Sequence, residues 1–293
     1  MSSKISSSTK NMGGRLGQHF LKDEKALKKI VGELELKSGD VIVEIGPGHG
    51  ELTREILNKF KDLKIQTSKV VAIEKDPTLV DGIEHLVSSK KLRVIEGDAL
   101  KVLPVLDTKY KMPNTGYKLV GNIPYYITGH LLRIVGELQK KPKLIVLTLQ
   151  KEVAERLTAG NPSTGAQGKM NILAASVGFW GKPEIIGFIS KQSFKPSPKV
   201  DSAIVKILPR QRRATKKQSE IYYGLIRALF KQPRKTILNN LSEGLGLPKK
   251  EVEAELKKLN FQSTSRGEVL NSTEINKLTA SPLFKRAIIK RKT

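Results

Sequence analysis

The sequence of 293 residues is long enough for one large domain and a smaller one. Its net charge of +25 indicates a polyanionic partner, most commonly a nucleic acid, although a lysine-rich proteome or an anionic membrane surface would also account for the charge. The absence of cysteine excludes disulfides and thiolate metal sites, and no apolar run approaches the roughly 20 residues that span a membrane, so we expect a cytoplasmic protein with no membrane partner and no metal.

The chain begins with a polar, serine-rich segment, residues 1–18, which we predict to be a flexible basic arm. It lacks the apolar stretch of a secretory signal. Residues 19–209 then alternate short Val/Ile/Leu runs with amphipathic stretches, the pattern of a parallel sheet covered by helices on both faces. Seven strands are expected, the last two as an antiparallel hairpin at the sheet edge: Val41–Ile45, Val70–Ile73, Leu92–Ile95, Leu119–Val120, Leu144–Leu149, Glu184–Ile189 and Ser202–Leu208.

Helical patterns frame these strands. Asp23 is expected to cap a helix that runs to about Leu34, and Glu51–Phe60 has apolar residues at helical spacing. The first 209 residues are therefore predicted to form an α/β domain.

The composition changes after Pro209. Arg210–Lys217 is polar and basic and is predicted to be a linker, after which Ser219 is expected to cap a helix. Two more helical patterns follow, one over Val252–Leu259 and one that begins at a capping box of Asn271 with Glu274. Residues 215–293, the most basic part of the chain, are predicted to form a small helical domain that binds RNA.

A glycine-rich loop follows the first large strand. Gly46, Gly48 and Gly50 allow a sharp turn and let backbone N–H groups approach a ligand. Nicotinamide and flavin enzymes use similar loops, but their spacing is G-x-G-x-x-G, whereas the spacing here is G-x-G-x-G. Glu44, just before the loop, would lie near a cationic ligand.

Acidic residues end the next two strands. Glu74 is positioned to accept hydrogen bonds from ribose hydroxyls, and the Asp98 carboxylate could accept one from an adenine amino group. Either acid alone could be an ordinary strand-end residue. Their order along the chain favours a site, because ligands bind at the carboxyl ends of strands in such sheets.

The sharpest motif is Asn122-Ile123-Pro124-Tyr125, directly after the fourth strand. An adenine amine is a poor nucleophile because its lone pair is delocalised into the ring. Fixed acceptors, here the Asn122 side-chain oxygen and the Ile123 carbonyl, would draw its hydrogens out of plane and free that lone pair. Pro124 would stiffen the turn and Tyr125 would stack on the base. The alternative is a plain proline loop with a buried tyrosine.

These motifs together resemble the small-subunit ribosomal RNA adenine dimethyltransferase family. The resemblance runs from about residue 13 to residue 284 and includes three further segments. They are Arg15-Leu16-Gly17-Gln18-His19-Phe20-Leu21, Phe194-Lys195-Pro196-Ser197-Pro198-Lys199-Val200-Asp201-Ser202-Ala203, and Phe230 to Leu241 with Arg234-Lys235-Thr236 and Asn239-Asn240-Leu241.

The resemblance implies a Rossmann-like, seven-stranded class I methyltransferase sheet with a small C-terminal all-helical domain. It implies a monomer that uses S-adenosylmethionine to dimethylate two adjacent adenines in a 3′-terminal hairpin of small-subunit rRNA, within a pre-ribosomal particle. Phe194 would sandwich the flipped base with Tyr125, unless it packs against the sheet instead. Cofactor contacts would fall on His19, Leu21, Gly46, Gly48, Glu74, Asp98 and Asn122, and RNA phosphate contacts on Lys195, Lys199, Arg234 and Lys235.

Rival functions remain open. A resistance-type enzyme that methylates an adenine of large-subunit rRNA shares the fold and the turn at residues 122–125. A ribosome-assembly factor that binds RNA without catalysis could also keep the fold, although an intact motif argues against it. A nicotinamide oxidoreductase is disfavoured by the loop spacing.

Overall fold

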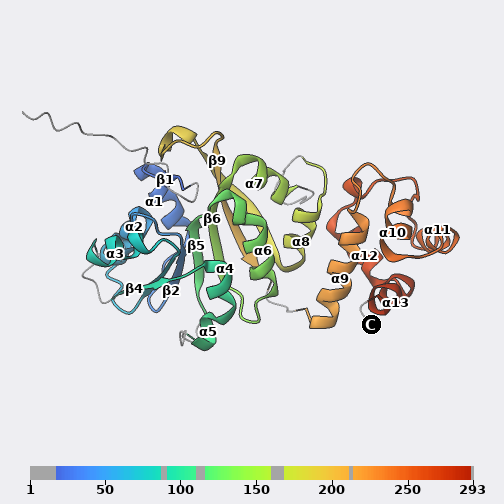
Figure 1. The fold of residues 1–293 in the computed structure, drawn as a ribbon, viewed down its shortest axis with the longest axis horizontal. Helices are drawn as coiled ribbons and strands as arrows, with labels where there is room; N and C mark the ends of the chain where they lie inside the picture. The colour runs from blue at the N-terminus through green and yellow to red at the C-terminus, as the bar shows by residue number, and fades with distance from the viewer. Residues whose placement is uncertain (1–17, 87–90, 110–115, 160–167, 211–213, 292–293) are drawn as a thin grey trace, which may run out of the picture.

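The computed structural model describes residues 18–86, 91–109, 116–159, 168–210 and 214–291. An α/β layer and a lobe of helices lie side by side along the long axis of the molecule (Figure 1). The predicted arm at residues 1–18 falls almost entirely outside the described residues. No helix in these ranges is long and apolar enough to cross a bilayer.

The main sheet contains the seven predicted strands in the order β4-β3-β2-β5-β6-β9-β7. The strands from β4 to β6 are parallel, while β9 runs antiparallel to both β6 and β7. Their bounds are Val41–Ile45 (β2), Lys69–Glu74 (β3), Leu92–Glu96 (β4), Lys118–Asn122 (β5), Leu144–Gln150 (β6), Gly181–Ile189 (β7) and Ser202–Pro209 (β9).

The hairpin of β7 and β9 confirms the expected antiparallel edge. Strand β7 begins three residues earlier than predicted and contains Pro183. An edge strand tolerates proline because the missing N–H need not remove a ladder hydrogen bond.

Helices cover both faces of the sheet because the strands are apolar on both sides. Residues of α1 and α2 form one core cluster with the sheet, and residues of α4, α6, α7 and α8 form another on the opposite face. As predicted, the Asp23 carboxylate caps α1, accepting from the N–H groups of Lys25 and Ala26. The helices are Glu24–Glu33 (α1), Glu51–Asp62 (α2), Pro77–Leu86 (α3), Ala99–Val102 (α4), Leu106–Lys109 (α5), Thr128–Glu137 (α6), Lys151–Thr158 (α7) and Ile172–Trp180 (α8).

The C-terminal lobe has a separate core that also takes in residues of α8. Tyr222 stacks on Phe179 at a centroid distance of 4.2 Å and donates from its hydroxyl to the Ala175 carbonyl, which joins the lobe to the α/β layer. The helices of the lobe are Lys216–Leu229 (α9), Ile237–Leu245 (α10), Lys249–Lys258 (α11), Ser272–Ala280 (α12) and Pro282–Lys290 (α13).

One predicted cap in this lobe is wrong. Thr215, rather than Ser219, caps α9, because Thr215 and Gln218 form a complete capping box one turn earlier. The end of the predicted linker, Lys216 and Lys217, is therefore helical. The predicted capping box of Asn271 with Glu274 is confirmed at α12.

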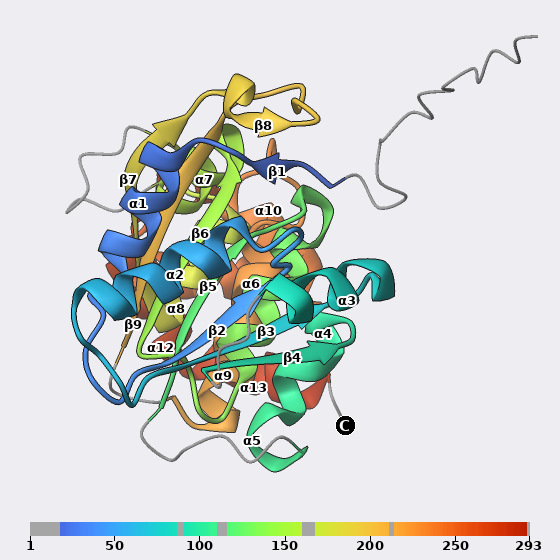
Figure 2. The same cartoon turned by 90° about the vertical axis from the view of Figure 1, so that its left-hand side faces the viewer.

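A small second sheet lies across the carboxyl ends of the central strands. Its two antiparallel strands are β1 (Phe20–Leu21) and β8 (Phe194–Lys195). They lie far apart in the sequence, near the beginning and near the end of the α/β layer, and come together in space (Figure 2). The sequence pattern did not predict them, since two-residue strands have no periodicity. They bring residues 18–23 beside the segment after β7, at the edge where the motifs converge.

Candidate functional site

The glycine loop joins β2 to α2 in a conformation that requires glycine. Gly46, Gly48 and Gly50 have φ angles of +63°, +60° and +80°, the left-handed region. A Cβ on Gly48 would stand 2.7 Å from ring atoms of Phe20. The loop therefore turns beneath the Phe20 ring with no room for a side chain at residue 48.

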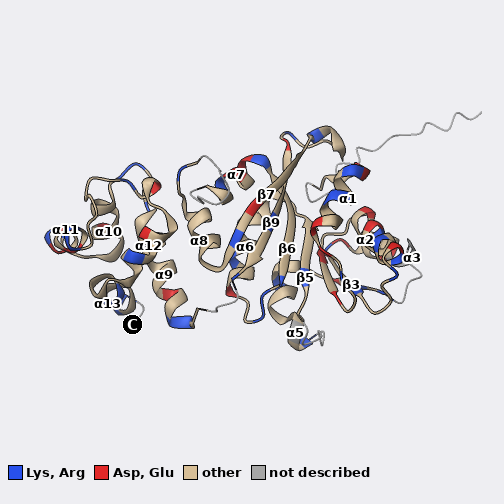
Figure 3. Cartoon of the chain, turned by 180° about the vertical axis from the view of Figure 1, so that it is seen from behind, with Lys and Arg blue, Asp and Glu red and all other residues tan. Residues whose placement is uncertain are grey.

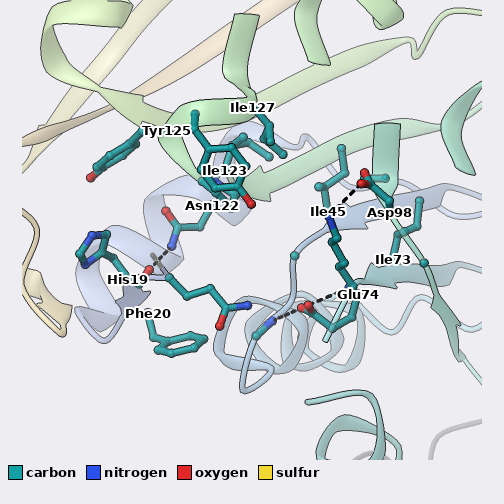
Figure 4. Close-up of a pocket in the computed structure, with 18 residues that line it drawn as sticks. His19, Phe20, Ile45, Ile73, Glu74, Asp98, Asn122, Ile123, Tyr125 and Ile127 are labelled. Atoms are coloured by element: carbon teal, nitrogen blue, oxygen red, sulfur yellow. Dashed lines mark hydrogen bonds and ion pairs between the residues drawn. The ribbon is translucent and has the colours of Figure 1, made fainter. Parts of the chain in front are cut away.

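Glu74 is held rigidly at the end of β3. One carboxylate oxygen accepts from the Gly48 N–H at 3.2 Å, and the other accepts from the N–H groups of Lys75 and Asp76 at 2.8 and 2.9 Å. The residue is only 2% exposed. Three backbone donors thus fix a carboxylate against the glycine loop. Dashed lines at Glu74 in Figure 4 mark hydrogen bonds of this set.

Asp98 follows β4 and lies on the same side of the site as Glu74 (Figure 4). It caps α4 by accepting from the Leu100 N–H, and its other oxygen accepts from Lys75 Nζ at 3.0 Å. Burial opposes ionisation, but these hydrogen bonds prevail and lower the pKa of Asp98, while the Asp98 carboxylate raises the pKa of Lys75. Both groups are therefore charged at neutral pH. Lys75 was not singled out from the sequence.

One pocket, of about 830 Å³ when its solvent-open part is counted, joins these elements. Apolar walls come from Ile45, Ile73 and Ile123, and Figure 4 shows Glu74 and Asp98 on one side with His19, Asn122 and Tyr125 on the other. Of the predicted site residues, the pocket is lined by His19, Gly46, Gly48, Glu74, Asp98, Asn122, Ile123, Pro124 and Tyr125.

Asn122, the last residue of β5, has a defined amide orientation. Its Nδ2 donates to the His19 carbonyl at 2.7 Å. A carbonyl oxygen only accepts, so the nitrogen must face His19, and the side-chain oxygen is left for another donor. The neighbouring peptide is also held, because the Ile123 N–H donates to the Thr148 carbonyl on β6.

Tyr125 stands beside Asn122 in the turn after β5. Its ring lies 6.0 Å from the His19 ring, at an interplanar angle of 28°, and its hydroxyl lies 3.0 Å from the Ser202 hydroxyl. Partial burial raises the pKa of Tyr125, against the effect of that hydrogen bond. The ring is therefore a neutral phenol with an anchored hydroxyl. Ser202 was not expected here, because only the sheet brings β9 to this turn.

Three residues singled out from the sequence do not line this pocket. Leu21 is 4% exposed and Phe194 is 2% exposed, and both belong to the core between the sheet and helices α1 and α2. Glu44 is buried beneath the glycine loop and accepts from the Thr53 hydroxyl at 2.6 Å; burial raises its pKa to about 8. The geometry of Phe194 matches the packing alternative, so its role as a stacking partner stays a prediction.

The predicted phosphate contacts occupy two places. Lys195 and Lys199 are exposed in the segment between β7 and β9, whereas Arg234 and Lys235 are exposed between α9 and α10. Lys235 shares Glu243 with Lys231. Figure 3 shows lysine and arginine on both the α/β layer and the C-terminal helices. An RNA that contacted both sets would have to extend from the pocket to the lobe.

Comparisons with known proteins cover nearly the whole chain. The family described as ribosomal RNA adenine dimethylase matches residues 9–284. Ribosomal RNA small subunit methyltransferase A of Dehalococcoides mccartyi is 38% identical over 261 residues, which is 88% of this chain and 84% of that protein. The protein of the same name from Clostridium botulinum strain Kyoto is 34% identical over 267 residues, 90% of this chain and 91% of the relative.

Two solved methyltransferase structures have a fold similar to that of this chain. A dimethyladenosine transferase from Plasmodium falciparum aligns with a TM-score of 0.68 at 28% identity, over 89% of this chain and 96% of that one. The 23S rRNA methyltransferase ErmE aligns with a TM-score of 0.67 at 25% identity, over 89% of this chain and 98% of ErmE. The match over residues 9–284 and the identity to these relatives show that this chain belongs to the ribosomal RNA adenine dimethylase family.

Proposed function

We propose that the protein dimethylates the N6 amino groups of two adjacent adenosines in a 3′-terminal hairpin of small-subunit rRNA, with S-adenosylmethionine as methyl donor. The family match and the relatives named small subunit methyltransferase A support the reaction and the subunit. The chain also resembles ErmE, a 23S rRNA methyltransferase. Methylation of large-subunit rRNA is therefore the outcome that the experiment must exclude.

The residues of the pocket fit S-adenosylmethionine. The Glu74 carboxylate is held against the glycine loop, where it would accept from ribose hydroxyls. Asp98 would accept from the adenine amino group, and the apolar walls would contact the adenine ring. Glu74 and Asp98 outnumber Lys75 among the charged side chains that line the pocket, and the net negative charge suits a ligand with a sulfonium and an ammonium group. When bound, the donor supplies an electrophilic methyl group.

The acceptors for the target amine would be Asn122 Oδ1 and the Ile123 carbonyl. Drawing the two N6 hydrogens toward fixed acceptors localises the nitrogen lone pair toward the methyl carbon. Placement of this kind supplies most of the acceleration in a displacement that needs no strong base. Tyr125 would hold the flipped base by stacking.

The observation that carries the proposal is the orientation of the Asn122 side-chain amide. Its nitrogen is committed to the His19 carbonyl, which leaves the oxygen as an acceptor at the pocket. An amide in the opposite orientation would present donors to an amine, which itself has hydrogens to donate. The orientation therefore suits an amine substrate.

The substrate is proposed to be a pre-ribosomal particle, which the protein engages as a monomer. Shape and phosphate contacts, rather than base contacts, would then select the site, with Lys195 and Lys199 near the flipped base and Arg234 and Lys235 farther along the RNA.

The test is mass spectrometry of small-subunit rRNA fragments after incubation of undermethylated subunits with protein and donor. Two neighbouring dimethylated adenosines in a 3′-terminal fragment are expected. Primer extension on both rRNAs accompanies it, and a stop confined to large-subunit rRNA would overturn the proposal. Binding of RNA without binding of donor, measured by calorimetry, would indicate an assembly factor instead.

A further inference from the structure

Residues 18–23 and residues 190–201 form one connected unit next to the pocket, which we call the clamp. Strands β1 and β8 pair within it. The Lys22 N–H donates to the Ser193 carbonyl at 2.8 Å, and the Ser193 hydroxyl donates to Asp23 at 3.0 Å. The clamp is thus held by both backbone and side-chain bonds.

The clamp reaches the pocket at His19. The His19 ring nitrogen Nδ1 lies 2.8 Å from the Pro196 carbonyl, so both halves of the clamp fix this residue. Its own carbonyl accepts from Asn122 Nδ2. The bond that orients the Asn122 amide is therefore only as rigid as the clamp.

Phe194 is an apolar anchor of the clamp, together with Leu21, which lies in the same core. It is 2% exposed, pairs with Leu21 in the β1–β8 register, and packs in the core that α1 and α2 form with the sheet. The adjacent Lys195 and Pro196 are exposed. Within residues 194–196, Phe194 alone ties the segment to the protein interior, and stacking on a base would require it to leave that core.

We propose that Phe194 is a positioning residue: it anchors the clamp, and the clamp holds the Asn122 amide with its oxygen toward the target amine. The inference rests on the proposed function and deepens it, because it makes residues 18–23 part of the methyl-transfer site. Releasing the clamp would free the Asn122 side chain to rotate about χ2, and the flipped amide would offer N–H groups to an amine.

The test compares Phe194→Leu with Phe194→Ala. Leucine fills most of the apolar site but cannot stack as an aromatic ring, so the anchoring role predicts a single-turnover rate within about threefold of wild type. Alanine leaves a cavity, and the rate should fall roughly a hundredfold, as misplacement of a reacting group by about 1 Å can cost that much. RNA affinity should change little in both variants. Phe188→Ala is the matched control, since Phe188 on β7 is 60% exposed.

A direct readout comes from selective ¹⁵N-asparagine labelling. The Asn122 side-chain NH₂ signal, assigned by its loss in Asn122→Ala, should keep its exchange protection in Phe194→Leu and lose it in Phe194→Ala. Ser193→Ala gives a second perturbation without opening the core, and it should weaken the same protection.

Equal loss of rate in Phe194→Leu and Phe194→Ala would show that an aromatic ring is required and would overturn the inference. So would an Asn122 signal that stays protected in both Phe194→Ala and Ser193→Ala. Failure of the wild-type protein to methylate rRNA would instead overturn the proposed function, and the Asn122 signals would still report on the clamp.

Discussion

Glu44→Gln should make the protein more stable at neutral and alkaline pH. Glu44 is 1% exposed, and within the described ranges its carboxyl has one hydrogen-bond partner, the neutral Thr53 hydroxyl; burial raises its pKa from 4.5 to about 8. In the unfolded chain the carboxyl ionises near its ordinary value. Between pH 4.5 and pH 8 the folded state therefore binds more protons than the unfolded state, and stability is lost as the pH rises through that window.

The size of this effect follows from the two pKa values. Ionisation of the unfolded state costs the folded protein about 1 kcal/mol at pH 5, about 3 kcal/mol at pH 7 and about 4 kcal/mol at pH 8, at 1.36 kcal/mol per pKa unit. Glutamine does not ionise and keeps an oxygen for Thr53. Any constant packing difference cancels when pH values are compared, so the advantage of the variant should grow by roughly 3 kcal/mol between pH 5 and pH 8.

Urea denaturation measures this directly. Trp180, the only tryptophan, is buried and reports unfolding by fluorescence, and circular dichroism should give a coincident transition. Glu253→Gln, at an exposed position of α11, is the control and should show no such trend. A difference between Glu44→Gln and wild type that stays constant from pH 5 to pH 8 would refute the suppressed ionisation of Glu44.

Four further predictions concern the pocket and the proposed RNA contacts. Asn122→Ala should lower the single-turnover rate roughly a hundredfold or more while RNA affinity in a filter-binding assay changes little; equal loss of both would contradict its role. Glu74→Gln should weaken donor binding about tenfold in calorimetry, since a hydrogen bond to a charged group is lost. Gly48→Ala should abolish donor binding altogether, because the φ angle of residue 48 is +60° and the new methyl group would meet the Phe20 ring. Arg234→Ala should reduce the salt slope of RNA binding by about one, whereas Lys61→Ala on α2 should leave it unchanged.

The sequence by itself determined the α/β layer and most of the pocket. Strands buried on both faces carry continuous Val/Ile/Leu runs, so β2 to β6 could be placed from local pattern alone. The carboxyl ends of parallel strands share one edge, which is why Glu74, Asp98 and Asn122 could be assigned to one site without coordinates. Local signals also fixed the caps at Asp23 and Asn271.

Only the tertiary structure decided how the site is held together. The bond from Asn122 to His19 joins residues 103 positions apart, and strands β1 and β8 are too short to have a periodic signal. Motif resemblance suggested that Phe194 is a base-stacking ring, but its burial depends on the packing of α1, α2 and the sheet around it. Whether an aromatic side chain faces a pocket or a core is set by its neighbours in space, and no local pattern at residues 194–203 encodes those neighbours.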